Sequence, residues 1–217
     1  MSLSRTSESR LKNALVLVPF MISAGGCVQM HPTRSGFLSD YSGVECIESM
    51  SRVFSKGDAR LTRLARDVAW DEIDSFYIEP VSWMADDLGQ PASSKQNADS
   101  IRDSLRMALV QELGAIRPIA KAAGPRTATV RSAVTGVQEG KPIINLITLA
   151  LSGPLFNGGA VVELEIVAPD GAQIVAASVA VQGRDWEVLG FFHKPRHAEN
   201  AVRRAAGYIA ADMLLVR

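Results

Sequence analysis

Apolar residues recur at steps of three and four in two stretches of the chain, the spacing that places side chains on one face of an α-helix. In residues 98–113 this repeat consists of Ile101, Leu105, Ala108, Leu109 and Leu113. Ser94 or Asn97 can cap the start of the helix, and Gly114 can end it. The pattern therefore predicts an amphipathic helix whose apolar stripe is buried.

The C-terminal stretch carries the same repeat. Its apolar positions are Ala198, Val202, Ala205, Ile209, Ala210 and Met213. The opposite face carries Glu199, Arg203, Arg204 and Asp212. We therefore expect a second amphipathic helix with its charged face in solvent.

Strands are clearest on either side of a Pro-Asp-Gly turn at residues 169–171. Residues 160–167 and 174–182 are rich in Val and Ile, and Asp-Gly is a strong hairpin signal. Apolar side chains alternate there with Glu163 and Glu165. This period of two predicts one buried face and one face in water.

Two further stretches, residues 75–84 and 127–138, also predict strands, whereas residues 61–65 fit either a strand or a helix. The resulting order is strand, helix, strand, long apolar connection, hairpin, helix, without regular βαβ alternation. We expect an α+β fold, a two-layer sandwich in which two helices pack on one face of a mostly antiparallel sheet.

Composition narrows the function classes. The chain has 217 residues, 47% of them hydrophobic, which suits one domain with its own core. Its formal net charge of zero leaves no basic footprint for a nucleic acid, so no nucleic-acid partner is expected.

The N-terminus has the pattern of a signal peptide. Arg5, Arg10 and Lys12 precede the apolar run 14–24, and Gly25-Gly26-Cys27 follows it. A membrane-spanning helix needs about 20 apolar residues, so this run is too short to be one. A plain secretory signal cut near Gly26, or an apolar element of the fold, are the alternatives.

The small residues before Cys27 resemble a bacterial lipobox. This resemblance implies cleavage between Gly26 and Cys27 and acylation of Cys27, with a diacylglyceryl group on sulfur and a fatty acyl chain such as palmitate on nitrogen. Because Val28 replaces the Asp that favours inner-membrane retention, the resemblance implies the periplasmic face of the outer membrane. Cys46 would then be either buried and inert or paired between molecules.

Residues 36–43, Gly-Phe-Leu-Ser-Asp-Tyr-Ser-Gly, place large side chains between turn formers. This pattern predicts a docking strap laid against the domain. We expect three parts: a signal peptide (1–26), the lipidated cysteine with a tether (27–35), and a single periplasmic α+β domain (36–217). The tether residues 28–35 span at most about 27 Å, at about 3.3 Å each.

Such a strap shortly after a lipobox cysteine resembles bacterial lipoproteins that carry the domain of unknown function 3313. Residues 78–83 and the apolar stretch from Pro142 into residues 158–165 also fit that family. The turn at residues 168–171 departs from the family's usual Asp-x-x-Thr-Gly. The resemblance covers residues 36–217 and implies an envelope lipoprotein, but no activity.

No catalytic motif, cofactor site or metal site emerges from the sequence. Glu163 and Glu165 could form an acid–base pair, but a solvated hairpin face is the favoured interpretation. His193 and His197 have zinc-ligand spacing, but Pro195 favours a helix start with solvated histidines. An enzyme site built from Asp40, Glu79 and His193 is the alternative to a non-enzymatic protein.

The apolar stretch 143–156 predicts a buried strand or core-covering segment; a patch that touches the membrane or a partner is the alternative. The candidate binding surface consists of Phe37, Leu38, Tyr41, Ile143, Leu146, Leu149 and Phe156. We therefore expect a non-enzymatic binding or structural protein, anchored to the membrane at Cys27, with an envelope protein as partner. A carrier of an apolar ligand is a further hypothesis.

Overall fold

The computed structural model describes residues 32, 34–46, 58–65, 68, 70–85, 95–138, 159–182 and 196–214. Several positions singled out in the sequence lie outside these ranges: the expected signal peptide, Cys27, the stretch 143–156 and His193.

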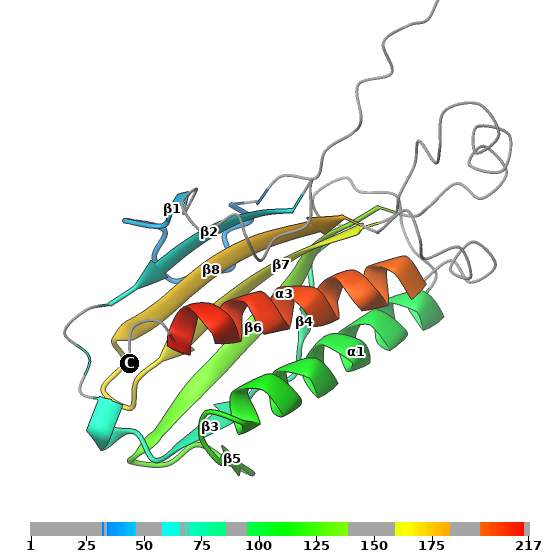
Figure 1. Cartoon of the computed structure of the whole chain (residues 1–217). Helices are drawn as coiled ribbons and strands as arrows, with labels where there is room; N and C mark the ends of the chain where they lie inside the picture. Colours follow the sequence, from blue (N-terminus) through cyan, green and yellow to red (C-terminus); the bar gives the residue numbers. More distant parts are fainter. Residues whose placement is uncertain are drawn as a thin grey trace, which may run out of the picture.

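An open eight-stranded sheet forms the centre of the molecule (Figure 1). Its strands are β1 (Glu45–Cys46), β2 (Ala59–Leu64), β3 (Ser75–Ile78), β4 (Ser82–Trp83), β5 (Ile119–Ala120), β6 (Thr127–Gln138), β7 (Gly159–Val167) and β8 (Gln173–Gln182). They lie in the order β1-β2-β8-β7-β6-β3-β5, and β4 also pairs with β6. Pairing is antiparallel from β1 through β6, whereas the short strands β3, β4 and β5 pair in parallel.

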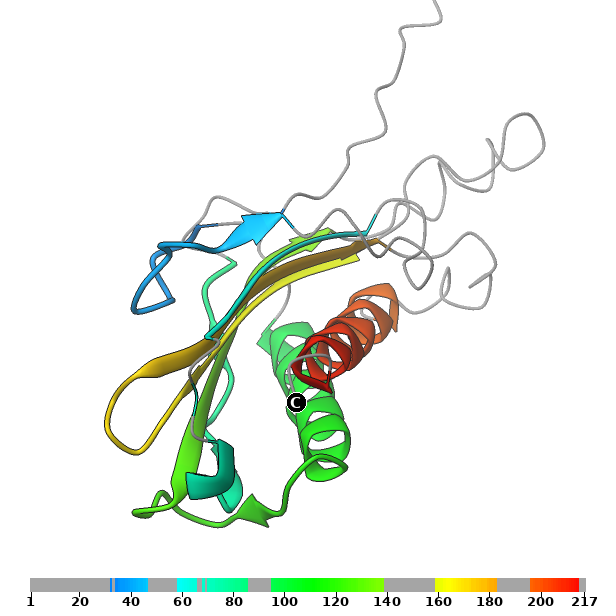
Figure 2. The ribbon, with the colours of Figure 1, turned by 60° about the vertical axis from the view of Figure 1, so that its left-hand side comes forward.

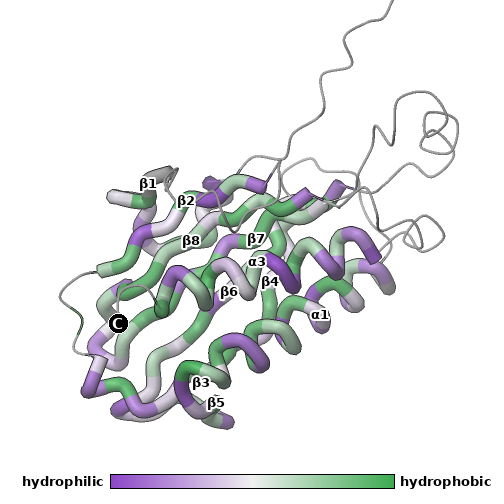
Figure 3. The backbone as a smooth tube through the Cα atoms, in the orientation of Figure 1, coloured by the Kyte–Doolittle hydropathy of each residue, from purple (hydrophilic) through white to green (hydrophobic). Residues whose placement is uncertain are grey.

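Two long helices, α1 (Lys95–Gly114) and α3 (Arg196–Leu214), cover one face of this sheet (Figure 2). The only other described helix is a short 3₁₀ turn, η2 (Trp70–Glu72). The expected α+β architecture, with both helices on one face, is confirmed. In Figure 3 hydrophobic residues mark long stretches of the central strands, while the two helices alternate between hydrophobic and hydrophilic residues.

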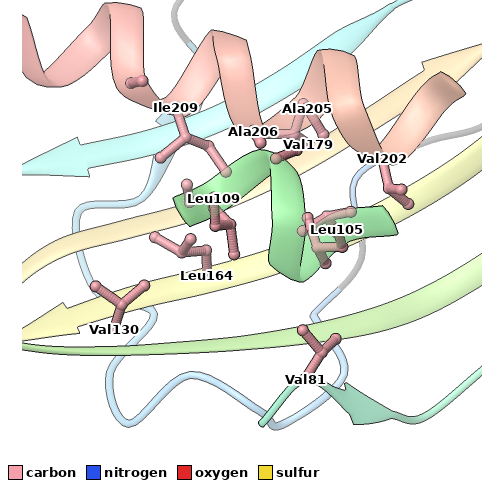
Figure 4. Close-up of a cluster of buried hydrophobic side chains, with 14 of the residues drawn as sticks. Val81, Leu105, Leu109, Val130, Leu164, Val179, Val202, Ala205, Ala206 and Ile209 are labelled. Atoms are coloured by element: carbon pink, nitrogen blue, oxygen red, sulfur yellow. The ribbon is translucent and has the colours of Figure 1, made fainter. Parts of the chain in front are cut away.

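The main core lies between the helices and the sheet (Figure 4). It contains Leu105 and Leu109 from α1, Val202, Ala205, Ala206 and Ile209 from α3, and Val130, Leu164 and Val179 from the sheet. These side chains are the apolar stripes of the two predicted helices and one face of the predicted strands. No helix among the described residues is long and apolar enough to cross a membrane.

Local differences from the sequence prediction have simple causes. The expected strand 75–84 is two strands, β3 and β4, and Pro80 between them has no N–H to donate. The ambiguous stretch around Leu61 is strand β2, because its residues pair along β8. Asp212, expected on the solvent face of the last helix, is only 2% exposed because it faces Arg60 and Thr62 of β2.

Candidate functional site

A strap, residues 34–44, lies on the face of the sheet opposite the helices (Figure 2). Gly36 (φ 88°) and Gly43 (φ 66°) adopt left-handed backbone conformations that glycine tolerates best, and they turn the chain at either end of the expected docking segment. Between them Leu38 is buried and packs with Val44 against Ala176 of β8. The predicted docking of this segment is confirmed.

The face of the sheet under the strap carries two rows of side chains, which together we call the strap seat. Strand register places Arg63, Ala176, Glu165 and Arg131 in one row across β2, β8, β7 and β6. The next row consists of Leu61, Ser178, Glu163 and Ala133. Small side chains beside each glutamate leave room for the strap backbone to approach the carboxylates.

Glu163 binds the beginning of the strap. Its Oε1 accepts the Ser35 N–H at 2.9 Å, and its Oε2 accepts the Ser35 hydroxyl at 2.8 Å and the Tyr41 hydroxyl at 2.6 Å. The Tyr41 oxygen in turn accepts the N–H groups of Gly36 (2.8 Å) and Leu38 (3.2 Å). One carboxylate and one phenol therefore fix the first turn of the strap.

Glu165 binds the middle of the strap. Its Oε2 accepts the Ser39 N–H and the Ser39 hydroxyl, both at 2.8 Å, and the side-chain amide of Gln173 at 2.6 Å. Its Oε1 accepts a hydrogen bond from Arg131, which also forms an ion pair. The Arg131 guanidinium lies 5.4 Å from the centre of the Phe37 ring, a cation–π distance.

Asp40 links the last part of the strap to strand β2. Its carboxylate accepts the Ser42 hydroxyl (2.6 Å) and N–H (2.7 Å), and Arg63 of β2 donates to it at 2.8 Å. The Ser42 hydroxyl above all, then the Ser42 N–H and Arg63, lower the pKa of Asp40 from 3.8 to about 2. Asp40 is therefore charged throughout the physiological range.

The expectation that Glu163 and Glu165 form a solvated hairpin face is wrong. Both side chains are 0% exposed, and β7 is buried on both faces. The alternation of charged and apolar residues does reflect two different faces, as predicted. The charged face is covered by the strap, a segment far away in sequence, and strap donors replace the water that these carboxylates would otherwise bind.

As an acid–base pair, the two glutamates are poorly placed. Every carboxylate oxygen already accepts at least one hydrogen bond, and Glu165 forms an ion pair with Arg131. These hydrogen bonds direct all four carboxylate oxygens at groups of the protein itself. The arrangement is suited to holding a peptide segment.

The alternative enzyme site is not brought together in the residues described. Asp40 binds Arg63 on β2, whereas Glu79 lies 3.7 Å from Arg131 on β6. Two strands separate β2 from β6, a distance of about 14 Å at the usual strand spacing. The third proposed member, His193, lies outside the described residues.

His197 falls in the first turn of α3, so the predicted helix start after Pro195 is confirmed. The expectation of a solvated side chain is wrong, because His197 is 4% exposed. Within the described part of the chain, no three His, Cys, Asp or Glu residues come together in a way that could hold a metal ion.

Three residues of the candidate binding surface lie in the described part of the chain, and all three belong to the strap. Leu38 is buried against β8, Tyr41 binds Glu163, and Phe37 is partly buried beside Arg131. Ile143, Leu146, Leu149 and Phe156 lie outside the described residues.

Sequence reasoning missed six residues of the site: Ser35, Ser39, Ser42, Arg63, Arg131 and Gln173. The available signal was a pair of acids in a strand otherwise made of Ala, Val, Leu and Ile, with an arginine in the preceding predicted strand. Their partners could not be identified because the strap is more than 120 residues from β7 in sequence.

The fold and the site define a class of protein, an α+β domain with two helices on one sheet face and a carboxylate-bound strap on the other. The chain belongs to the family described as protein of unknown function (DUF3313), whose model matches residues 33–212. This match confirms the family resemblance expected from the strap motif.

Among solved structures, the chain is similar to the PelC dodecamer from Paraburkholderia phytofirmans. The two are 12% identical, with a TM-score of 0.41, and the match covers 73% of this chain and 96% of that chain. A point variant of the same dodecamer gives 12% identity, a TM-score of 0.39, and coverage of 73% and 95%. The comparison with curated proteins gave no match.

Proposed function

We propose that this protein is a lipid-anchored lipoprotein of the cell envelope, a non-enzymatic binding or structural component that faces the periplasm from the outer membrane. One observation carries the proposal: the chain is fixed to the sheet at Ser35, only eight residues after the cysteine of the lipobox-like sequence.

The short distance along the chain gives the anchor a mechanical role. Eight residues span at most about 27 Å, so an acylated Cys27 would keep Ser35 within that distance of the lipid surface. Two or more acyl chains give stable attachment, because each buried methylene contributes about 0.8 kcal/mol. The domain would then stay at the membrane without lipid contacts of its own.

The chemistry of the strap seat supports a non-enzymatic role. The most conspicuous acidic pair of the sequence, Glu163 and Glu165, binds the segment that connects the domain to the anchor. We infer that these carboxylates hold the segment next to the anchor against the sheet, so that the sheet stays close to the membrane. The partner that the domain would bind or brace is an envelope component.

The test is acylation at Cys27. In a bacterial host with the lipoprotein pathway, Cys27→Ser should leave the precursor uncleaved and unacylated, as measured by intact mass and by flotation with vesicles. Cys46→Ser is the matched control and should be processed like the wild type. Normal cleavage and flotation of Cys27→Ser would contradict the proposal.

A further inference from the structure

The strap is attached to the sheet by side chains. Over the ranges that the structure describes, no main-chain-to-main-chain hydrogen bond joins residues 34–44 to β2, β6, β7 or β8. The polar contacts run instead through two carboxylates, Gln173 and Arg63. A segment bound in this way can leave without disrupting any strand pairing of those four strands.

The seat is also polar. A buried pair of carboxylates is a poor choice for a permanent contact, because apolar residues of similar volume are often as stabilising or more so. Water can solvate both glutamates when the strap leaves, and Arg131 stays beside Glu165. The apolar contact of the strap is confined to one small cluster, in which Leu38 and Val44 pack on Ala176 beside the partly buried Phe37, Tyr41 and Leu61.

From these contacts we propose that the strap is a releasable latch that sets how far the domain reaches from the membrane. The inference rests on the proposed lipid anchor at Cys27. With the strap bound, Ser35 is the first residue for which the structure describes a hydrogen bond to the sheet. With the strap released, the first fixed residue is Glu45 of β1, which pairs with Thr62.

The two states differ strongly in reach. From Cys27 to Ser35 the extended chain spans at most about 27 Å, and from Cys27 to Glu45 at most about 60 Å, at about 3.3 Å per residue. Release therefore more than doubles the distance over which the domain can meet a partner, and the sheet and helices keep their fold.

Hydrogen exchange of the full chain tests the latch itself. The strap amides of Ser35, Leu38 and Ser39 should exchange together, and at least about tenfold faster than the amides of β7 and β8, because they open by a local transition. Equal protection of strap and sheet would overturn the proposal, since the strap would then open only when the whole domain unfolds.

Tyr41→Phe sharpens this test. The variant removes the hydroxyl that joins Gly36, Leu38 and Glu163, so strap exchange should rise about tenfold while β7 and β8 stay unchanged. Tyr77→Phe is the matched control, since its hydroxyl has no hydrogen bond to the part of the chain that the structure describes. An equal effect on strap and sheet in Tyr41→Phe, or no effect on the strap, would contradict a latch.

Fluorescence resonance energy transfer between a dye on the domain and a labelled lipid measures how far the domain lies from the membrane. The acylated protein, with a Cys46→Ser background and a donor dye at Met107→Cys on the exposed side of α1, is reconstituted in phosphatidylethanolamine–phosphatidylglycerol vesicles with an acceptor lipid. Ser35→Ala, Ser39→Ala and Tyr41→Phe combined should lower the transfer efficiency. Unchanged transfer efficiency in the vesicle-bound variant would overturn the proposal that the strap sets the distance between the domain and the membrane.

The two proposals fail in different ways. Absence of acylation or flotation in the wild type would refute the anchor and with it the role in reach, whereas the exchange experiment judges the latch without any lipid. Anchored protein whose strap exchanges as slowly as its sheet would refute the latch and leave the anchor intact.

Discussion

At the scale of single residues, the cost of burying charge explains which residue types the strap contains. An ionised carboxylate in a dry environment is unstable unless hydrogen bonds replace its lost water. Glu163 receives two hydroxyls and one N–H from the strap, and Glu165 receives one of each together with Gln173 and Arg131. The serines and the tyrosine of the strap are therefore matched to the acids of β7.

Removal of the Glu163 carboxylate tests this matching. Glu163→Ala takes away the acceptor of Ser35 and Tyr41, so we expect a loss of about 1–3 kcal/mol in the free energy of unfolding, measured by urea denaturation. Glu72→Ala, at an exposed position, should change it by less than about 0.5 kcal/mol. Equal effects of the two substitutions would contradict the role of Glu163.

The lowered pKa of Asp40 predicts a pH dependence. A carboxyl whose pKa falls from 3.8 to about 2 on folding stabilises the folded state above pH 3.8, and this contribution is lost as the pH falls through about 2. The stability difference between wild type and Asp40→Asn should therefore be largest near pH 5 and shrink between about pH 4 and pH 2. A constant difference in acid denaturation curves would be evidence against it.

At the scale of elements, local pattern decides most of the structure. The apolar repeats in residues 98–113 and 198–213 correctly predicted α1 and α3, and the Asp-Gly turn correctly predicted the hairpin of β7 and β8. The stretch around Leu61 stayed ambiguous because its buried polar residues, Arg60 and Thr62, hide the alternation of a strand. Its pairing with β8 is a long-range contact, which local periodicity does not contain.

The two leucines at the centre of α1 should carry much of the helix packing. Leu105 is 0% exposed in the core shown in Figure 4, so Leu105→Ala should lower the free energy of unfolding by about 2–5 kcal/mol. Met107 lies on the same helix and is 59% exposed, so Met107→Ala should stay within about 0.5 kcal/mol of the wild type. Similar losses in both variants, measured by urea denaturation, would contradict the assigned faces of α1.

At the scale of the molecule, the sheet is covered on both sides, by helices on one and by the strap on the other (Figure 2). The helix side could be predicted because apolar stripes and apolar strand faces reveal burial directly. The strap side could be predicted only in part: the aromatic residues indicated docking, but the carboxylate seat is polar and had the pattern of a solvated surface. A polar contact between distant segments leaves no periodic signal in either one.

A buried ion pair joins strand β2 to the C-terminal part of α3. Arg60 of β2 binds Asp212 in the last turns of α3, and Thr62 donates to the same carboxylate at 3.2 Å. Burial raises the pKa of Asp212 above 3.8, against the opposing effect of Arg60 and Thr62. The pair therefore costs desolvation, which the attraction between Arg60 and Asp212 and the Thr62 hydrogen bond have to offset.

This balance predicts a non-additive pair of substitutions. Asp212→Leu alone should cost about 3–5 kcal/mol, because it removes the buried carboxylate that Arg60 faces, whereas Arg60→Met with Asp212→Leu should return close to the wild-type stability or exceed it. Asp74→Ala, which breaks the exposed pair with Arg126, is the control and should have a far smaller effect in the same urea titration. If the double variant is as unstable as Asp212→Leu, the ion pair itself holds α3 in place. If the double variant recovers, as we expect, apolar packing is sufficient to hold α3 on the sheet.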